Sequence, residues 1–210
     1  MAKRPSTLAA RLAQISSILL TFDSRSNLVR ADCADAFVAP DVYTPAMSLK
    51  EAFRQIEEAL LAETRRHYGD RLVSLVVYGS VGRGTMRPDS DIDLLIVADD
   101  LPAGRIPRVS DFAEVEQRLA PLLERFRQDG IPTELSPVFK TREEAARLTP
   151  LFLDMVDDAL ILHDREGFFA GVLDRLRSRL AALGSRRIWR GNAWYWDLKP
   201  DYRPGEIFEL

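Results

Sequence analysis

Two aspartates at alternate positions open an apolar segment in the middle of the chain. Asp91 and Asp93 flank Ile92 and are followed by the run LLIV at residues 94–97. Because alternate residues of a β-strand point to the same face, the two carboxylates are expected to lie side by side at the start of a buried strand. Like charges at that distance raise the pKa of one group unless a cation lies between them. Mg²⁺ suits such a pair, since it binds one or two carboxylates together with substrate phosphates.

A glycine–serine pair stands upstream of the aspartates. Gly79 and Ser80 follow the apolar run 72–77, and ten residues, 81–90, separate them from Asp91. A turn of this kind offers backbone N–H groups and a hydroxyl to a phosphate chain. The intervening loop holds three further residues suited to a phosphate site, namely Gly82, Arg83 and Arg87.

Each of these residues also has a structural explanation. Glycines make tight turns, and a Ser-Asp pair after Pro88 is a common way to cap a short helix. Asp93 is harder to explain in this way, because a charge at the mouth of an apolar strand is costly without a partner. We therefore favour metal binding as the role of Asp91 and Asp93.

The segment that carries these residues, YGSVGRGTMRPDSDIDLLIV, resembles the GSx10DxD signature of the minimal nucleotidyltransferases, a branch of the DNA polymerase beta superfamily. The resemblance covers about residues 70–140. It implies the α/β (α+β) class with a polymerase-beta-like nucleotidyltransferase fold, a small mixed sheet with helices packed on one face. It also implies that Gly79 and Ser80 bind a nucleoside triphosphate, that Asp91 and Asp93 hold Mg²⁺, and that a third carboxylate on a later strand completes the site.

Glu134 is the best candidate for the third carboxylate. It lies in the β-like segment IPTELSPVF, which follows a well-formed helical pattern. Pro132 and Pro137 flank it, and because proline cannot donate to a sheet, this strand must be short or lie at an edge. Glu143 and Glu144 are alternatives, but they fall in a capping-box pattern that opens a helix, which gives them a structural role.

The resemblance implies a reaction as well as a fold. Nucleotidyl transfer needs in-line positioning and neutralisation of charge more than covalent work by the protein. With Asp91, Asp93 and Glu134 holding two Mg²⁺ ions, one ion would activate the acceptor hydroxyl and the other would stabilise the leaving pyrophosphate. The chain is thus predicted to be a Mg-dependent transferase of the EC 2.7.7 type that moves a nucleoside monophosphate, AMP from ATP in the first instance, onto a hydroxyl.

The acceptor is left open among a protein side chain, an RNA end and a small molecule. Antitoxins that share the signature place AMP on a tyrosine of a HEPN-type toxin, so the resemblance makes such a toxin the most specific partner. Two other classes of function remain: a non-catalytic antitoxin-like protein that blocks its partner, and an RNA-binding module. The intact Gly-Ser and DxD residues favour the enzyme, because a pure binder has no need of clustered unpaired acids.

Composition is that of a globular protein. Hydrophobic residues make up 46% of the chain and charged residues 29%, with a net charge of −3, so nothing global argues for nucleic acid or an acidic membrane. Cys33 is the sole cysteine, so no internal disulfide can form and a reducing compartment, the cytoplasm, is expected. No apolar stretch approaches the ~18 residues of a membrane span, so no membrane partner is expected.

Hydrophobic periodicity predicts the elements around the motif. We expect a helix near the N-terminus with Leu8, Leu12, Ile15 and Leu19 on one face, and then an extended arm. Further helices are expected at about 48–69, 110–130, 141–148, 150–158 and 165–183, with strands on both sides of the motif and a loop through Pro107. Three parts follow: the N-terminal helix and arm (1–47), the nucleotidyltransferase core (48–140), and C-terminal helices with an aromatic tail that pack on the core (141–210).

The C-terminal segment is unusually basic and aromatic. Residues 175–190 contain six arginines and no acid, and the aromatic residues there and just after are Trp189, Trp194, Tyr195 and Trp196. Such a segment suits phosphate contacts and base stacking on RNA, or an aromatic ring that covers the nucleotide site. The third interpretation is that the arginines face solvent and the tryptophans pack the tail onto the domain. We favour the third, because the last helix already has a buried leucine face.

Overall fold

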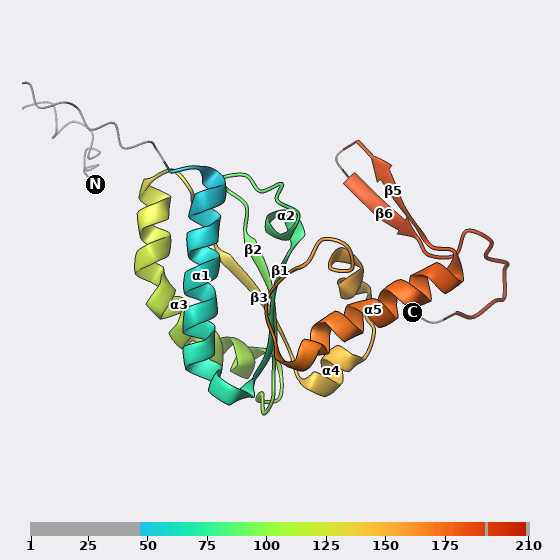
Figure 1. Ribbon diagram of the computed structural model, residues 1–210, viewed down its shortest axis with the longest axis horizontal. Helices are drawn as coiled ribbons and strands as arrows, with labels where there is room; N and C mark the ends of the chain where they lie inside the picture. Colours follow the sequence, from blue (N-terminus) through green and yellow to red (C-terminus); the bar gives the residue numbers. More distant parts are fainter. Residues whose placement is uncertain (1–46, 192, 209–210) are drawn as a thin grey trace, which may run out of the picture. The chain divides into compact units, whose positions relative to one another are not determined.

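A four-stranded mixed sheet forms the centre of the chain (Figure 1). The computed structural model describes residues 47–191 and 193–208, so the predicted N-terminal helix and nearly all of the arm lie outside the described residues. The sheet has the order β3-β2-β1-β4 and consists of β1 (Leu72–Tyr78), β2 (Ile92–Ala98), β3 (Leu135–Lys140) and β4 (Leu160–Asp164). β1 is antiparallel to both of its neighbours, and β2 is parallel to β3. The predicted fold class is confirmed.

The two central strands are almost entirely buried. Every residue of β1 is buried, and in β2 only Asp93 is not fully buried. Central strands covered on both faces are expected to be continuous apolar runs, as LVSLVVY and IDLLIVA nearly are. Asp93 is therefore the one charged side chain in either strand. β3 lies at the edge of the sheet and is six residues long, as its prolines require.

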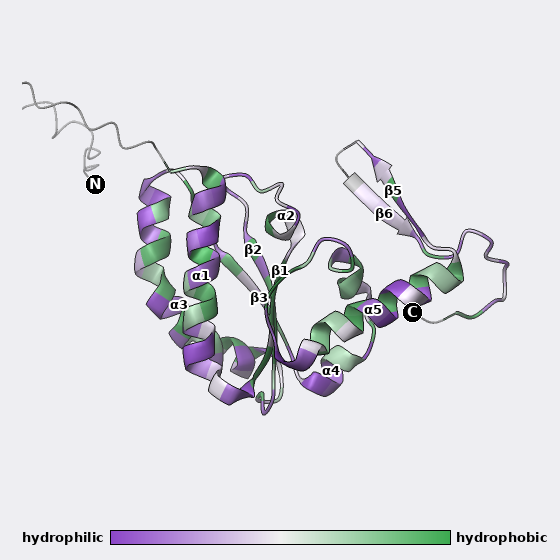
Figure 2. Cartoon of the chain, viewed as in Figure 1, coloured by the Kyte–Doolittle hydropathy of each residue, from purple (hydrophilic) through white to green (hydrophobic). Residues whose placement is uncertain are grey.

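Two long helices, α1 (Leu49–Tyr68) and α3 (Arg105–Gln128), lie side by side on one face of the sheet (Figure 1). Their apolar sides turn towards the sheet (Figure 2) and contribute Phe53, Ile56, Leu60, Phe112, Val115 and Phe126 to a buried core. The helices of the predicted core thus lie on one face, as expected.

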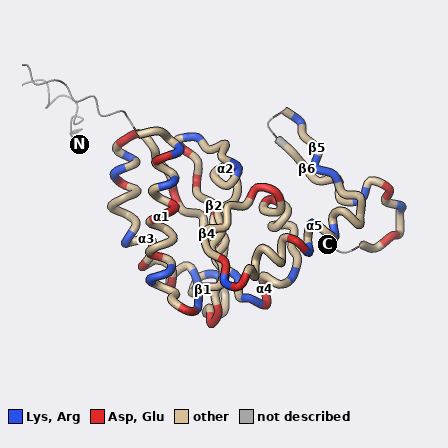
Figure 3. Tube along the Cα trace, in the orientation of Figure 1, with Lys and Arg blue, Asp and Glu red and all other residues tan. Residues whose placement is uncertain are grey.

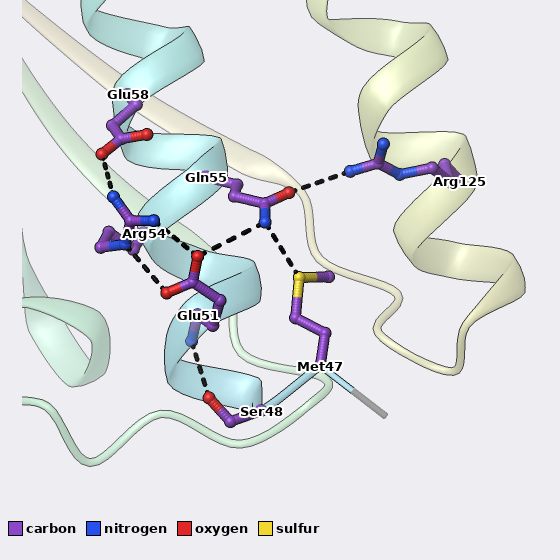
Figure 4. A network of polar contacts seen from close by, with 7 residues as sticks. All are labelled: Met47, Ser48, Glu51, Arg54, Gln55, Glu58 and Arg125. Carbon is purple, nitrogen blue, oxygen red and sulfur yellow. Dashed lines mark hydrogen bonds and ion pairs between the residues drawn. The ribbon is translucent and has the colours of Figure 1, made fainter. Parts of the chain in front are cut away.

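The N-terminus of α1 is held by a local polar network (Figure 4). The Ser48 hydroxyl accepts a hydrogen bond from the Glu51 backbone N–H at 3.2 Å, and Gly69 follows the last turn, so the helix spans the range expected from the sequence. Arg125 of α3 donates to the Gln55 side chain at 3.1 Å, which ties the two helices together.

The start of α3 differs from the prediction. The helix begins at Arg105, five residues before Ser110, so Pro107 lies in its first turn instead of a loop. Proline is tolerated there because the first N–H groups of a helix have no intrahelical partner. Arg108 explains the earlier start: its guanidinium is bound by both Glu144 oxygens and by the carbonyls of Pro102 and Phe139.

The opposite face of the sheet is covered by elements that follow residue 140. These are α4 (Arg142–Ala146), the 3₁₀ turn η2 (Pro150–Asp154) and α5 (Phe168–Leu183). The helix expected at 150–158 is wrong: Phe152 and Met155 are both buried, and their spacing of three residues suits a 3₁₀ turn, in which such positions lie on one side. The predicted capping box of Thr141 and Glu144 is present. α5 begins at Phe168 and ends at Gly184, after the short turn η3 (Arg165–Gly167).

Three smaller elements complete the described chain. The turn η1 (Gly69–Arg71) leads into β1, and α2 (Gly79–Gly82) follows it. The C-terminal aromatic segment forms an antiparallel hairpin of β5 (Arg186–Arg190) and β6 (Ala193–Asp197). None of the helices described here has the length and apolar character needed to cross a membrane.

Candidate active site

The Asp93 carboxylate lies against the first residue after β1. Asp93 is paired with Tyr78 in the sheet, and Gly79 comes next in the chain with φ of +67°. A Cβ atom on Gly79 would lie 2.1 Å from Asp93 Oδ2. Only glycine therefore leaves room for this carboxylate, and the two halves of the GSx10DxD pattern meet at van der Waals distance.

Asp91 and Asp93 are neighbouring acids whose charge is only partly compensated, by Arg83 and by a hydrogen bond from the Ser136 side chain to Asp93. Asp93 is half-buried and Asp91 is exposed at the entrance to β2. Neither carboxylate forms an ion pair within residues 47–191 and 193–208. Burial raises the pKa of Asp93, and the Asp91 charge raises it further, whereas Arg83 lowers it. A folded chain that keeps two acids in mutual repulsion is expected to bind a cation there.

These residues fit a hard divalent cation. Both carboxylates lie on the face of the sheet that bears the side chains of Tyr78 and Leu95, at the open end of β2. Mg²⁺ is commonly held by one or two carboxylates, with phosphate and water oxygens filling the other positions. Among the described residues no cluster of three or more metal-ligating side chains occurs.

The backbone of Glu134 lies next to Ile92, between the two aspartates, but its side chain lies near the Arg127 guanidinium. Its backbone carbonyl accepts a hydrogen bond from the Ile92 N–H at 2.8 Å, one residue before β3 begins. Its side chain is 76% exposed and lies 3.9 Å from the Arg127 guanidinium at the end of α3. The structure does not bring its carboxylate into a three-acid cluster, and its role as third ligand stays a prediction.

Asp154 is an acid that the sequence reasoning missed. It is the last residue of η2, is half-buried, and its charge contributes to raising the pKa of both Asp93 and Tyr78. Burial also raises the pKa of Asp154 itself, while Arg83 and Arg187 lower it. Nothing in the segment PLFLD marks it as functional, because its proximity to Asp93 arises only when η2 packs on the sheet.

A cavity of about 540 Å³ has Ser80 and Ser90, the direct neighbours of Gly79 and Asp91, among its lining residues. One wall is formed by Ser80 of α2 and by the loop between α2 and β2, through Arg83, Thr85, Arg87 and Ser90. The opposite wall is the C-terminal hairpin, through Trp189, Gly191 and Trp194. The predicted phosphate-binding residues Ser80, Arg83 and Arg87 are thus brought to one cavity. Its size is in the range of sites for small ligands.

Gly82, at the end of α2, allows close packing of the backbone next to this cavity. A Cβ atom on it would lie 2.8 Å from the backbone oxygen of Asp158 and 2.9 Å from that of Val77. The segment after η2 can therefore approach α2 only because residue 82 has no side chain. Gly82 holds two segments of the site together, which is a different role from the predicted phosphate contact.

Several C-terminal arginines bind their own chain. Arg175 donates to the carbonyls of Ala146 and Gly171, Arg177 binds Asp174 and the Val156 carbonyl, and Arg187 binds Asp158 at 2.6 Å. These contacts favour the packing interpretation of the basic segment over the RNA-binding one.

Comparison with known proteins agrees with this geometry. Residues 57–147, less than half of the chain, match the family model of the nucleotidyltransferase domain. A putative protein adenylyltransferase of Methanocaldococcus jannaschii is 28% identical over 130 residues, which cover 61% of this chain and 83% of that protein. The matched family segment includes the Gly-Ser pair, both aspartates and Glu134, and it ends before Asp154 and the hairpin.

Solved structures of toxin–antitoxin complexes show a more distant similarity. One, crystallised with AMP-PNP, has a TM-score of 0.38 and 19% identity, and the match covers 61% of this chain and 92% of that chain. The MntA–HepT toxin–antitoxin structure has a TM-score of 0.37 and 15% identity, with coverage of 62% and 92%.

Proposed function

We propose that this protein transfers a nucleoside monophosphate, AMP from ATP, onto a hydroxyl group of another protein. The observation that carries this proposal is the contact of Asp93 with Gly79, which sets a carboxylate that forms no ion pair among the described residues beside the Gly-Ser turn, whose Ser80 lines the 540 Å³ cavity. The family match over residues 57–147 supports a nucleotidyltransferase activity for the same residues.

The chain's own residues supply binding and orientation. Ser80 offers a hydroxyl at the cavity wall, and Arg83 and Arg87 offer positive charge to a triphosphate. The Arg87 backbone N–H donates to the Ser90 hydroxyl at 2.9 Å, which fixes the loop between α2 and β2. These groups would hold the polyphosphate so that its α-phosphorus faces the Asp91–Asp93 edge, where positioning does most of the catalytic work.

Asp91 and Asp93 would hold the divalent metal, which when bound neutralises the developing phosphate charge and lowers the pKa of an acceptor hydroxyl. The number of ions and their identity as Mg²⁺ are parts of the proposal that rest on the resemblance.

The acceptor class follows from the curated relative. The Methanocaldococcus jannaschii protein is named a putative protein adenylyltransferase, so a protein hydroxyl is the acceptor that we propose here. The narrower prediction, a tyrosine of a HEPN-type toxin, rests on the resemblance of the GSx10DxD segment. Identification of the labelled acceptor would test it directly.

Thermal unfolding with nucleotide tests the binding step. Mg²⁺-ATP should raise the Tm of the wild-type protein, and the double variant Asp91→Asn/Asp93→Asn should lose the shift, because neutral amides bind Mg²⁺ poorly. Asp174→Asn, on an exposed turn of α5, is a matched control that should keep it. Equal shifts in wild type and double variant would defeat the proposal.

Transfer is tested with α-labelled ATP and a cell extract. Label should appear on a protein band in a manner that depends on Asp93. Binding of ATP without any transfer would favour the blocking antitoxin, and retention of a mixed RNA on a filter, lost on removal of the C-terminal arginines, would favour the RNA-binding module.

A further inference from the structure

The hairpin gathers an arginine and all of the chain's tryptophans on one face. Trp189 is paired with Trp194 and Arg187 with Trp196 across the two strands. Because alternate residues share a face, all four side chains project from the same side of the hairpin. The chain contains three tryptophans, so none lies elsewhere.

This face is anchored at its base to the segment that follows η2. Arg187 is only 13% exposed and binds Asp158 at 2.6 Å and Asp157 at 3.6 Å. The Trp196 indole N–H donates to the Leu153 carbonyl at 3.3 Å. Figure 3 shows basic positions on the hairpin of β5 and β6. The aromatic face is therefore held in a defined place near Asp154.

Above the anchor, Trp189 is exposed and Trp194 is partly buried. The Arg187 guanidinium lies 4.9 Å from the Trp189 ring centroid and 4.2 Å from that of Trp194, which orients both indoles. Trp189 nevertheless remains 56% exposed, and both rings line the cavity opposite Ser80 and Arg83. Large aromatic surface that is fixed in place and left open next to a polar, basic wall is typical of a ligand site.

From this arrangement, and resting on the proposed function, we propose that Trp189 and Trp194 form the nucleobase platform of the nucleotide site. A nucleoside triphosphate would lie across the cavity, with its phosphates on the Ser80, Arg83 and Arg87 wall and its base stacked on an indole. Stacking grows with ring area, so purine nucleotides are the class that this platform favours. The platform lies outside residues 57–147, so it belongs to this chain's C-terminal addition to the matched domain.

Intrinsic fluorescence provides a direct readout, because every tryptophan is in the hairpin. Mg²⁺-ATP should quench the emission of the wild-type protein. Trp189→Ala/Trp194→Ala should raise the Kd for Mg²⁺-ATP, measured by calorimetry, about tenfold or more, whereas the affinity for inorganic tripolyphosphate should stay unchanged. Trp189→Phe should retain most of the ATP affinity, since it keeps an aromatic ring.

The matched control is Tyr195→Ala. Tyr195 is an aromatic residue of the same hairpin, 45% exposed, on the opposite face, so its loss should leave ATP affinity unchanged. Circular dichroism of each variant establishes that the fold is retained, and if the double alanine variant unfolds, Trp189→Leu replaces it as the variant without an aromatic platform.

The outcomes separate the two proposals. A wild type that binds neither ATP nor tripolyphosphate overturns both the function and the platform. Normal ATP affinity in the folded variants lacking the indole rings overturns the platform alone. An RNA oligonucleotide that loses affinity in these variants while ATP does not would also overturn it, and would assign the tryptophans to RNA.

Discussion

Gly79 and Asp93 are packed so closely that a methyl group on the glycine would lie 2.1 Å from a carboxylate oxygen of the aspartate. Asp93 lies in β2 and Gly79 directly follows β1, and the antiparallel register of these strands, which pairs Tyr78 with Asp93, brings the two residues together. The conformation of the turn and the position of the carboxylate are therefore set by one contact.

Gly79→Ala is expected to lower nucleotide transfer strongly and to lower the free energy of unfolding only modestly. The added methyl group must displace the Asp93 carboxylate, and a misplacement of about 1 Å in a catalytic group can lower activity about a hundredfold. The positive φ adds a strain of roughly 1–2 kcal/mol. Gly184→Ala is the control, because Gly184 has φ of +68° with no atom within 4 Å of its Cβ position. Both variants should lose similar stability in urea unfolding, and only Gly79→Ala should lose nucleotide transfer; equal transfer rates would contradict the role of this contact.

Gly82→Ala and Gly171→Ala should change stability in opposite directions. A methyl group at 82 overlaps two backbone oxygens, so the variant should unfold about 1–3 kcal/mol more easily. At Gly171, inside α5, a Cβ meets no atom within 4 Å, so alanine should stabilise the protein by about 0.5–1 kcal/mol. Urea midpoints measure both effects. An unchanged urea midpoint for Gly82→Ala would contradict this prediction, because it would show that the segment after η2 can move away from α2 without cost.

Asp154 and Glu134 can be compared as third acids by metal titration. Asp154 is half-buried and close enough to Asp93 to raise its pKa. The Glu134 side chain is 76% exposed and lies 3.9 Å from Arg127. We expect Asp154→Asn to raise the Mg²⁺ concentration for half-maximal ATP binding about tenfold, and Glu134→Gln to raise it less. The reverse order would retain Glu134 as the third ligand.

The Glu144–Arg108 pair predicts a pH dependence of stability. The Arg108 hydrogen bonds lower the pKa of Glu144 from 4.5 to about 2. A depressed carboxyl pKa stabilises the fold above the unfolded value, so this contribution is complete above about pH 4.5 and is lost as the pH falls towards 2.

Glu144→Gln should therefore cost about 1–2 kcal/mol at neutral pH, a value limited by solvent screening because the Glu144 side chain is 41% exposed. The difference from wild type should shrink as the pH approaches about 2.5, measured by urea unfolding. Glu143→Gln, at the exposed neighbouring position, should behave as wild type. A constant difference across this range would exclude the ion pair as its cause.

Local signals predicted those elements whose ends are fixed by nearby residues. α1 lies between Ser48 and Gly69, at the expected range, and α4 begins after the Thr141 capping box. Both ends were predictable because caps satisfy backbone groups within a few residues. The start of α3 was misjudged because Arg108 is drawn into the structure by Glu144 and the Phe139 carbonyl, which lie far along the chain. The division into an arm, a core and a C-terminal part stays a prediction, as does the cytoplasmic location.

The spacing of the Gly79–Ser80 pair and the two aspartates was enough to predict that the turn and the acids lie close together, because a strand, a short loop and a second strand leave the chain few other arrangements. Their shared role in a site stays a prediction. Asp154 and the tryptophan pair could not be predicted in this way. Their distance from Asp93 depends on how η2 and the hairpin pack, and contacts of high sequence separation leave no local pattern. Residue order alone determined that two acids and a Gly-Ser turn meet at the edge of β2, because they lie on adjoining strands and the short loop between them. Packing of the C-terminal elements decided which further acid lies near Asp93 and which aromatic rings line the cavity.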